Sequence, residues 1–314
     1  MKAAVVFPGQ GAQRPGMGRD FYDQSPAARE VFETASRLSG RSFAQLCFES
    51  DEETLRNTEN AQPALLTVGY AGWRALKEAV PDFLPAYFAG HSMGEYTALA
   101  ASETLTFEET FHWIDIRARA MKESGFRHPG SMVAILGLDA ETAQAACDAA
   151  QAATGEIVAI ANFNCPGQLV ISGQPKAVEA AVEECKARGA KRAIPLAVAG
   201  PFHSPMMQEA ADQMYGAYEQ ANFKAGIAPV VANVTARPVT DPGQWRQIMA
   251  SQVAQPVRWQ ESIEWMTANG VDTFIEIGVG DVLTGLIKRI APDATMLKAT
   301  DGPSLAATIE AIRA

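Results

Sequence analysis

The 314-residue chain has few of the residues that build metal centres or disulfides, and it has no long apolar run. Its four cysteines and four histidines are scattered, without the close spacing of metal ligands, so we expect reduced thiols and no metal site. No segment approaches the roughly 20 apolar residues that span a membrane, and the stretch before Pro8 is too short for a secretion signal. We therefore expect a cytoplasmic protein.

Positive charge is also scarce. The chain has 26 Lys and Arg against 36 Asp and Glu, for a formal net charge of −10. Such a surface repels phosphate backbones and anionic lipid, so nucleic acid and membranes are poor partners. The hydrophobic share of 47% and the absence of low-complexity tracts are typical of a globular protein, which we expect to be a monomer.

Short apolar runs alternate with longer amphipathic runs along most of the chain. This alternation predicts a mainly parallel sheet covered by helices on both faces. The expected strands are 3–7, 86–89, 229–232, 272–277 and 295–298, and the expected helices are 26–38, 61–79, 94–103, 107–125, 204–220, 243–254, 259–269, 281–290 and 303–313.

The middle of the chain has a different order. Residues 131–197 run strand, helix, strand, strand, helix, strand, the βαββαβ order of a ferredoxin-like unit. Asp139 and Pro175 suit the starts of its two helices. We expect this small domain, 128–197, to be inserted into a large α/β domain made of 1–127 and 198–314, with a ligand in the cleft between them.

The stretch FAGHSMGEY places Ser92 in a Gly-x-Ser-x-Gly pattern between an expected strand and an expected helix. In such a turn the serine is exposed at the start of the helix, and the N–H of Met93 can donate to an oxyanion. The alternative is a Gly-rich turn with a capping serine. The strand and helix on either side favour a nucleophile.

A serine nucleophile needs a base, and four histidines are candidates. His203 lies in a loop where the chain returns from the small domain to the large one, which favours it. His91 is the immediate neighbour of Ser92, so its side chain should point elsewhere. His112 lies within a helix, and His128 lies at the domain boundary.

Two further features, a Gly-rich loop and an arginine in an apolar helix, are candidates for a role beside the serine. VVFPGQGAQ lacks the third glycine of a dinucleotide fingerprint, because Arg14 stands there, and we expect its loop to bring the N–H of Gln10 toward the oxyanion. Arg117 lies at the edge of an apolar helix face. It either links to solvent or a structural carboxylate, or binds a substrate carboxylate in a bidentate manner, and spacing does not choose.

Motifs along the whole chain resemble the malonyl-CoA:acyl carrier protein transacylases and the related acyltransferase domains of polyketide synthases. The resemblance implies an α/β-hydrolase-like large domain with a parallel sheet and an inserted ferredoxin-like small domain. The matching stretches are FPGQGAQ, NAQPAL, GHSMGEY, IRARAM, NFNCPGQLVISG, GAKRAIPLAVAGPFHSPMM, ANVTARPV, SQVAQPVRW and IEIGVGDVLTGLIKRI.

The resemblance also implies a role for each position of the site. The implied roles are the acylated nucleophile and its base, Ser92 and His203; the oxyanion hole, Gln10 and Met93; the ligand of the malonyl carboxylate, Arg117; the main-chain support of the base, Gln252; and the lining of the cleft, Gln62 and Asn162. Phe202 is similar to the malonyl-preferring pattern. Met93 stands where Leu, Ile, Val or Gln is commoner, which weakens the expected acyl selectivity.

The implied reaction is a ping-pong transfer of malonyl from malonyl-CoA, through a malonyl-serine, to the phosphopantetheine thiol of holo acyl carrier protein. It needs no cofactor and would serve fatty-acid or polyketide synthesis. Its alternatives are an acyl hydrolase, the malonyl transferase subunit of a malonate decarboxylase, and a non-catalytic docking module, which would be expected to lack part of the site. The expected carrier-protein surface, otherwise an ordinary solvated face, is Lys191, Arg192, Lys288 and Arg289.

Overall fold

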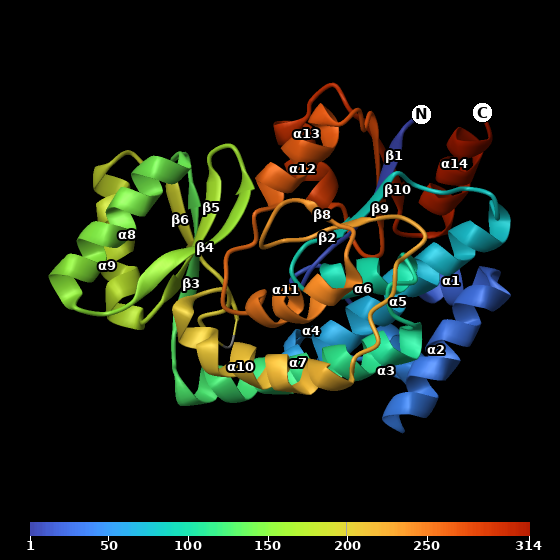
Figure 1. The fold of residues 1–314 in the computed structure, drawn as a ribbon, viewed down its shortest axis with the longest axis horizontal. Coiled ribbons are helices and arrows are strands. Elements are labelled where there is room, and N and C mark those ends of the chain that lie inside the picture. Colours follow the sequence, from blue (N-terminus) through green and yellow to red (C-terminus); the bar gives the residue numbers. More distant parts are fainter. Residues whose placement is uncertain (199) are drawn as a thin grey trace.

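A six-stranded sheet forms the centre of the larger part of the molecule, and a separate four-stranded sheet lies to one side of it (Figure 1). The computed structural model describes residues 1–198 and 200–314. The larger sheet has the order β10-β9-β1-β2-β7-β8, and its neighbours are parallel except β7 with β8. Its strands are β1 (Ala3–Phe7), β2 (Tyr87–Gly90), β7 (Val230–Val231), β8 (Pro238–Val239), β9 (Thr273–Ile277) and β10 (Thr295–Ala299).

Helices pack against both faces of the larger sheet, as the alternating pattern predicted. The helices of this part are α1 (Arg19–Gln24), α2 (Pro26–Ser39), α3 (Phe43–Glu49), α4 (Glu52–Arg56), α5 (Thr58–Ala79), α6 (Gly94–Ala101), α7 (Phe107–Arg127), α10 (Gln208–Ala217), α11 (Trp245–Ser251), α12 (Trp259–Ala268), α13 (Val282–Ile290) and α14 (Gly302–Arg313). No helix in the described part of the chain is long and apolar enough to cross a membrane.

Strand β1 shows how the two faces are filled. Val5 and Phe7 pack into the main core with α2, α5 and α6, whereas Ala4 and Val6 pack into a second core with α12 and α13. All five residues of the strand are buried. A strand covered on both sides is apolar throughout, which explains the continuous run AAVVF.

The smaller sheet is antiparallel, with the order β4-β5-β3-β6. Its elements are β3 (Ser131–Leu136), α8 (Ala140–Thr154), β4 (Val158–Cys165), β5 (Gln168–Gly173), α9 (Pro175–Ala187) and β6 (Arg192–Pro195), in the predicted ferredoxin-like order. Asp139 caps α8 by accepting the N–H of Thr142, and Pro175 begins α9. Both helix starts are therefore confirmed.

The smaller sheet is packed onto the larger part. Helices α8 and α9 cover one of its faces, and the other face contributes Met132, Ala161 and Val170 to the main core. The segment after α11 adds main-chain bonds: Phe163 N–H donates to Val257 O at 2.9 Å, and Val257 N–H donates to Ala161 O at 2.9 Å. The core contacts and these main-chain hydrogen bonds together hold the smaller sheet against the larger part, next to the segment that follows α11.

The structure corrects several predicted helix boundaries. The run predicted as one helix over 204–220 is α10 between two 3₁₀ turns, Pro205–Met207 and Tyr218–Gln220. Helix α5 begins three residues before the predicted 61, at Thr58, because Asn57 caps it by accepting the N–H of Glu59. The short elements α1, α3, α4 and β8 were not predicted, since a few residues carry too little periodicity to identify an element.

Candidate active site

Ser92 occupies a strained turn between β2 and α6. Its φ is 51°, in the left-handed region that is unfavourable for a residue with a side chain. A Cβ on Gly90 would lie 1.9 Å from the carbonyl carbon of Gly94, and a Cβ on Gly94 would lie 2.2 Å from the carbonyl oxygen of Phe7. Both flanking positions therefore require glycine, which is the physical basis of the predicted GHSMG turn.

His203 is placed to take the serine proton. Its Nε2 lies 2.7 Å from Ser92 Oγ, and its Nδ1 lies 2.8 Å from the carbonyl oxygen of Gln252 and 3.2 Å from that of Gln255. Because carbonyls only accept hydrogen bonds, Nδ1 carries the ring proton and Nε2 is the acceptor for the hydroxyl. Main-chain carbonyls thus orient this imidazole, in the position where a catalytic triad has a carboxylate.

The surroundings of His203 keep it neutral. Its side chain is buried, at 4% exposed. Burial and, after it, the positive charge of Arg117 lower the pKa of His203 to about 3, while the hydrogen bonds to the carbonyls of Gln252 and Gln255 oppose both effects. The imidazole is therefore unprotonated at neutral pH, as a general base must be.

Arg117 lies beside the nucleophile and is only 1% exposed. Its Nη2 donates to Ser92 Oγ at 3.1 Å and to Gln252 Oε1 at 2.9 Å, and its Nη1 donates to Gln62 Oε1 at 2.6 Å. Across residues 1–198 and 200–314, no carboxylate forms a salt bridge with Arg117, and its Nε–H has no partner. The sequence left open that Arg117 links to solvent or to a structural carboxylate. The side chain does neither, because it is buried and forms no salt bridge in the described residues.

Gln252 connects the other groups of the site. Its main-chain carbonyl accepts from His203 and its side-chain Oε1 accepts from Arg117. Its Nε2 donates to the carbonyl oxygen of Ser92 at 2.8 Å and to Glu95 Oε2 at 2.6 Å. Gln252, the residue after α11, therefore contacts Ser92 and Arg117 through its side chain and His203 through its main-chain carbonyl.

The loop after β1 passes close to the Ser92 turn. His91 N–H donates to Phe7 O at 3.0 Å, and a Cβ on Gly9 would lie 2.6 Å from His91 O. Among the hydrogen bonds of the described residues, the N–H groups of Gln10 and Met93 have no acceptor. The N–H of Met93, the residue after Ser92 and the N-cap of α6, is one uncommitted donor, and the N–H of Gln10, in the loop that contacts this turn, is another. An oxyanion hole requires two such donors.

The remaining predicted site residues are all buried. Gln62 is buried and contacts Arg117 directly. Asn162 is a buried residue of β4 at the point where that strand meets Val257. Phe202 is buried next to the base, and the Met93 side chain packs in the main core.

The four predicted basic residues are exposed and only partly gathered. Lys191 and Arg289 line one cavity of about 660 Å³ between the turns of the smaller sheet and the larger part, whereas Arg192 and Lys288 do not line it. Arg289, on α13, donates to Gln168 Oε1 at 2.9 Å and to Pro166 O at 2.6 Å. It therefore connects α13 to the β4–β5 turn.

The other histidines take no part in this arrangement. His91 Nε2 lies 2.9 Å from Asn164 Oδ1, so its side chain leaves the turn in another direction, as predicted. His112 and His128 are exposed, and His128 pairs with Glu209. The four cysteines are buried free thiols.

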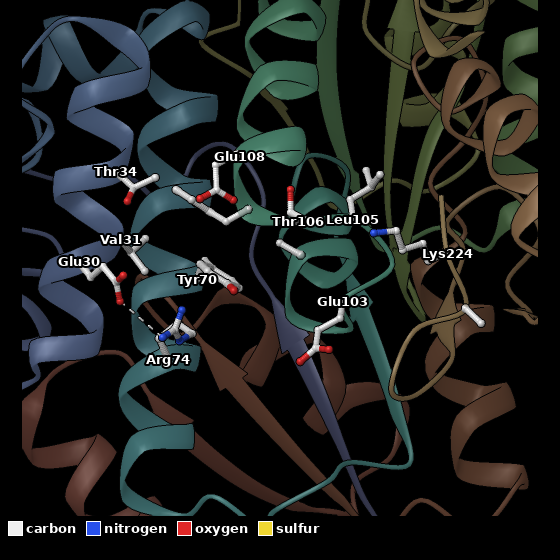
Figure 2. Close-up of a pocket in the computed structure, with 13 residues that line it drawn as sticks. Glu30, Val31, Thr34, Tyr70, Arg74, Glu103, Leu105, Thr106, Glu108 and Lys224 are labelled. Atoms are coloured by element: carbon white, nitrogen blue, oxygen red, sulfur yellow. Dashed lines mark ion pairs between the residues drawn. The ribbon is translucent and has the colours of Figure 1, made fainter. Parts of the chain in front are cut away.

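A second cavity, of about 450 Å³, lies away from the site (Figure 2). Figure 2 shows Tyr70 and Arg74 on its α5 side, with Glu30 of α2 facing Arg74. The two charged side chains form a salt bridge of 3.7 Å. None of the predicted site residues lines it.

Two buried residues of the site were missed from the sequence. Asn233, just after β7, accepts the N–H of Ser92 at 2.7 Å and donates to Gly90 O at 2.6 Å. Glu95, in α6, accepts from Gln252 and from the N–H of Asn233 at 3.1 Å. The signal for Glu95 was available, since it is the one acidic residue in the apolar helix EYTALAA.

Comparison with known proteins agrees with this geometry. The family described as acyl transferase domain matches residues 4–302. The chain is 42% identical to the malonyl CoA-acyl carrier protein transacylase of Bacillus subtilis (strain 168), over 99% of this chain and 98% of that protein.

Solved structures give the same relationship. An acyl carrier protein S-malonyltransferase from Vibrio cholerae superposes with a TM-score of 0.94 at 40% identity, over 98% of this chain and 100% of that one. A malonyl-transacylase in complex with its type II PKS acyl-carrier protein superposes with a TM-score of 0.94 at 38% identity, over 99% and 100% of the two chains. The chain therefore belongs to the acyl transferase family, among the malonyl CoA-acyl carrier protein transacylases.

Proposed function

We propose that this protein transfers a malonyl group from malonyl-CoA to the phosphopantetheine thiol of acyl carrier protein. The observation that carries the proposal is the buried Arg117 guanidinium, which lies 3.1 Å from Ser92 Oγ without a carboxylate in salt-bridge contact in the described chain. A buried charge without a direct counter-ion is unfavourable, so the site is complementary to an acyl group that brings its own carboxylate.

In the first half-reaction His203 Nε2 removes the Ser92 proton as Oγ attacks the thioester carbonyl. The N–H groups of Gln10 and Met93 stabilise the oxyanion of the tetrahedral intermediate. Collapse of the intermediate breaks the carbon–sulfur bond, and the CoA thiolate takes the proton from His203. The products are malonyl-Ser92 and free CoA.

In the second half-reaction the phosphopantetheine thiol enters in place of CoA. His203 accepts its proton as sulfur attacks the malonyl-serine ester, and the same N–H groups stabilise the second oxyanion. The carbon–oxygen bond then breaks, and Ser92 recovers its proton from His203. Arg117 holds the malonyl carboxylate through both steps.

Transfer is favoured over the hydrolase alternative by the relatives, which include a malonyl-transacylase solved with its acyl-carrier protein.

We propose the surface around Lys191, Arg192, Lys288 and Arg289 as the docking site for an acidic carrier protein. A cytoplasmic location, the monomeric state and the domain division at 128–197 belong to the same proposal. Both fatty-acid and polyketide synthesis use this reaction.

One experiment tests the reaction and its acyl group together. The protein is mixed with an equimolar set of acyl-CoA thioesters, and its intact mass shows which acyl group it retains. Holo acyl carrier protein is then added. We expect a malonyl adduct that moves to the carrier protein. An adduct lost to water at the same rate without carrier protein would instead identify a hydrolase.

A further inference from the structure

A buried carboxylate lies behind the nucleophile and has no part in the mechanism above. Glu95 is the second residue of α6 and is 0% exposed. Its Oε2 accepts Gln252 Nε2 at 2.6 Å, and its Oε1 accepts the N–H of Asn233 at 3.1 Å. Both of these partners contact Ser92 in turn, Gln252 at the carbonyl oxygen and Asn233 at the N–H.

The orientation of the Gln252 amide follows from the carboxylate. An amide has one acceptor end and one donor end, and a carboxylate can only accept. The NH₂ end of Gln252 must therefore face Glu95, which leaves Oε1 to accept from Arg117. An amide turned the other way would place its NH₂ group against the guanidinium, donor against donor.

The same arrangement keeps the carboxylate away from the guanidinium. Within the described chain Glu95 and Arg117 form no salt bridge, and the Gln252 amide lies between them. A carboxylate in direct contact would occupy the N–H groups that a substrate carboxylate needs. Burial raises the pKa of Glu95 to about 7, and the hydrogen bonds from Gln252 and Asn233 and the charge of Arg117 oppose that rise. Both carboxylate oxygens accept hydrogen bonds here, as the ionised form does, and that form prevails above pH 7. Acting through the amide, its negative charge can then stabilise the cation without occupying the guanidinium donors.

We propose that Glu95 is a positioning residue that fixes the Gln252 amide, and thereby holds Arg117 in the orientation that selects a carboxylated acyl group. The inference rests on the proposed malonyl transfer. It assigns selectivity to a residue that contacts neither the substrate nor Arg117.

The primary test replaces the carboxylate by an amide of the same shape. Glu95→Gln leaves one acceptor facing two donors, so the Gln252 amide loses or weakens its contact with residue 95 and is held only by its bonds to the Ser92 carbonyl and to Arg117. The measurement is the rate of Ser92 acylation by malonyl-CoA and, separately, by acetyl-CoA, read from intact mass. We expect the malonyl-to-acetyl rate ratio to fall about 10-fold or more, because small misplacements at a reacting centre have effects of that order. An unchanged ratio would overturn the proposal.

Glu276→Gln is the matched control. Glu276 is also a fully buried carboxylate, in β9, and it accepts from Leu283 N–H and from the N–H and hydroxyl of Thr284. It has no hydrogen bond to a residue of the site among those described. Loss of stability is expected in this variant, with the malonyl-to-acetyl ratio unchanged. If the malonyl-to-acetyl ratio fell equally in Glu276→Gln, the change in Glu95→Gln would be explained by general destabilisation of the protein, and the proposal would be overturned.

A double-mutant cycle tests the route through Gln252. Gln252→Met removes the amide and should lower the same ratio by itself. If Glu95 acts through this amide, Glu95→Gln adds no further loss of selectivity to Gln252→Met, whereas additive losses would overturn the route. Gln252→Met also serves if Glu95→Gln does not fold, since a wild-type ratio in that variant contradicts the proposal. Failure of the proposed function would appear separately, as wild-type protein that takes up no malonyl group.

Discussion

The two sheets of this protein contribute differently to its candidate active site. In the six-stranded sheet β1, β2 and β7 run parallel, so the segments after them meet at one edge and bring Gln10, Ser92 and Asn233 together. In the antiparallel four-stranded sheet neighbouring strands end at opposite edges. That sheet instead places Asn162 where β4 meets Val257, and Asn164 against His91, the neighbour of Ser92 in the chain.

The two parts of the molecule therefore differ in which step of the proposed reaction their residues can affect. The groups that touch the nucleophile come from the larger part, while Lys191 and Arg192 lie exposed on the smaller sheet. We therefore expect substitutions in the larger part to change the chemistry or the acyl preference. Substitutions on the smaller sheet should change how the carrier protein binds.

The largest effect is expected for Ser92→Ala, which removes the attacking oxygen. Covalent acylation by malonyl-CoA should disappear from the intact mass, and transfer to carrier protein should fall by about 10⁴-fold or more. The fold should persist, because an alanine at this position keeps the main-chain contacts of the turn, and thermal unfolding provides the control. Normal turnover by this variant would place the nucleophile elsewhere.

Arg117→Ala should change the acyl preference. Removing the cation deletes charge-assisted hydrogen bonds to the malonyl carboxylate, so kcat/KM for malonyl-CoA should fall about 10²-fold. Acylation by acetyl-CoA should be spared or increased, since Ser92 and His203 remain. Steady-state kinetics with both donors checks this, and equal losses for both would contradict the assignment of Arg117 to the carboxylate.

The protonation of His203 gives a prediction that needs no turnover. Its pKa is lowered to about 3 from an ordinary value near 6.5, so its ring should stay neutral from pH 8 down to pH 5. Nitrogen-15 NMR of labelled histidine checks this, with His203→Gln to assign the signal. Protonation midway near pH 6.5 would contradict the burial argument.

The same lowered pKa has a consequence for stability. The unfolded chain binds a proton at His203 below about pH 6.5, whereas the folded protein binds it only near pH 3. The contribution of His203 to stability is therefore fully present above pH 6.5 and is lost as pH falls from there toward 3. In Arg117→Ala the midpoint of ring protonation should rise, because a nearby positive charge is removed.

The smallest effect is expected on the smaller sheet. Reversing charge with Lys191→Glu and Arg192→Glu should raise KM for carrier protein about 3- to 10-fold and leave the kinetics with malonyl-CoA alone unchanged, because these side chains are exposed and remote from the acyl group. The matched control is Arg56→Glu with Lys176→Glu, two exposed basic residues outside this surface, which gives the same change in net charge. An unchanged KM in the double reversal would remove this surface from the docking site.

Local sequence signals were sufficient for much of this protein. The alternation of short apolar and longer amphipathic runs predicted a sheet covered on both faces, and the βαββαβ order predicted the smaller sheet, because side-chain periodicity is a property of neighbouring residues. The glycines around Ser92 are another local signal, since a side chain at either position would collide with the turn itself or with β1. His203 and Arg117 were candidates by residue type and setting.

Only the tertiary structure decided which candidates meet. Ser92 and His203 are 111 residues apart, Ser92 and Asn233 are 141 apart, and Glu95 and Gln252 are 157 apart, so no spacing along the chain could relate them. The structure also shows that Arg117 is buried without a direct counter-ion, which is a property of the packed core and supports the proposed binding of a substrate carboxylate. Sequence determined which groups the site could use. The packing of α7, the loop before α10 and the segments after β7 and α11 around the Ser92 turn determined which of them lie within hydrogen-bonding distance of the serine.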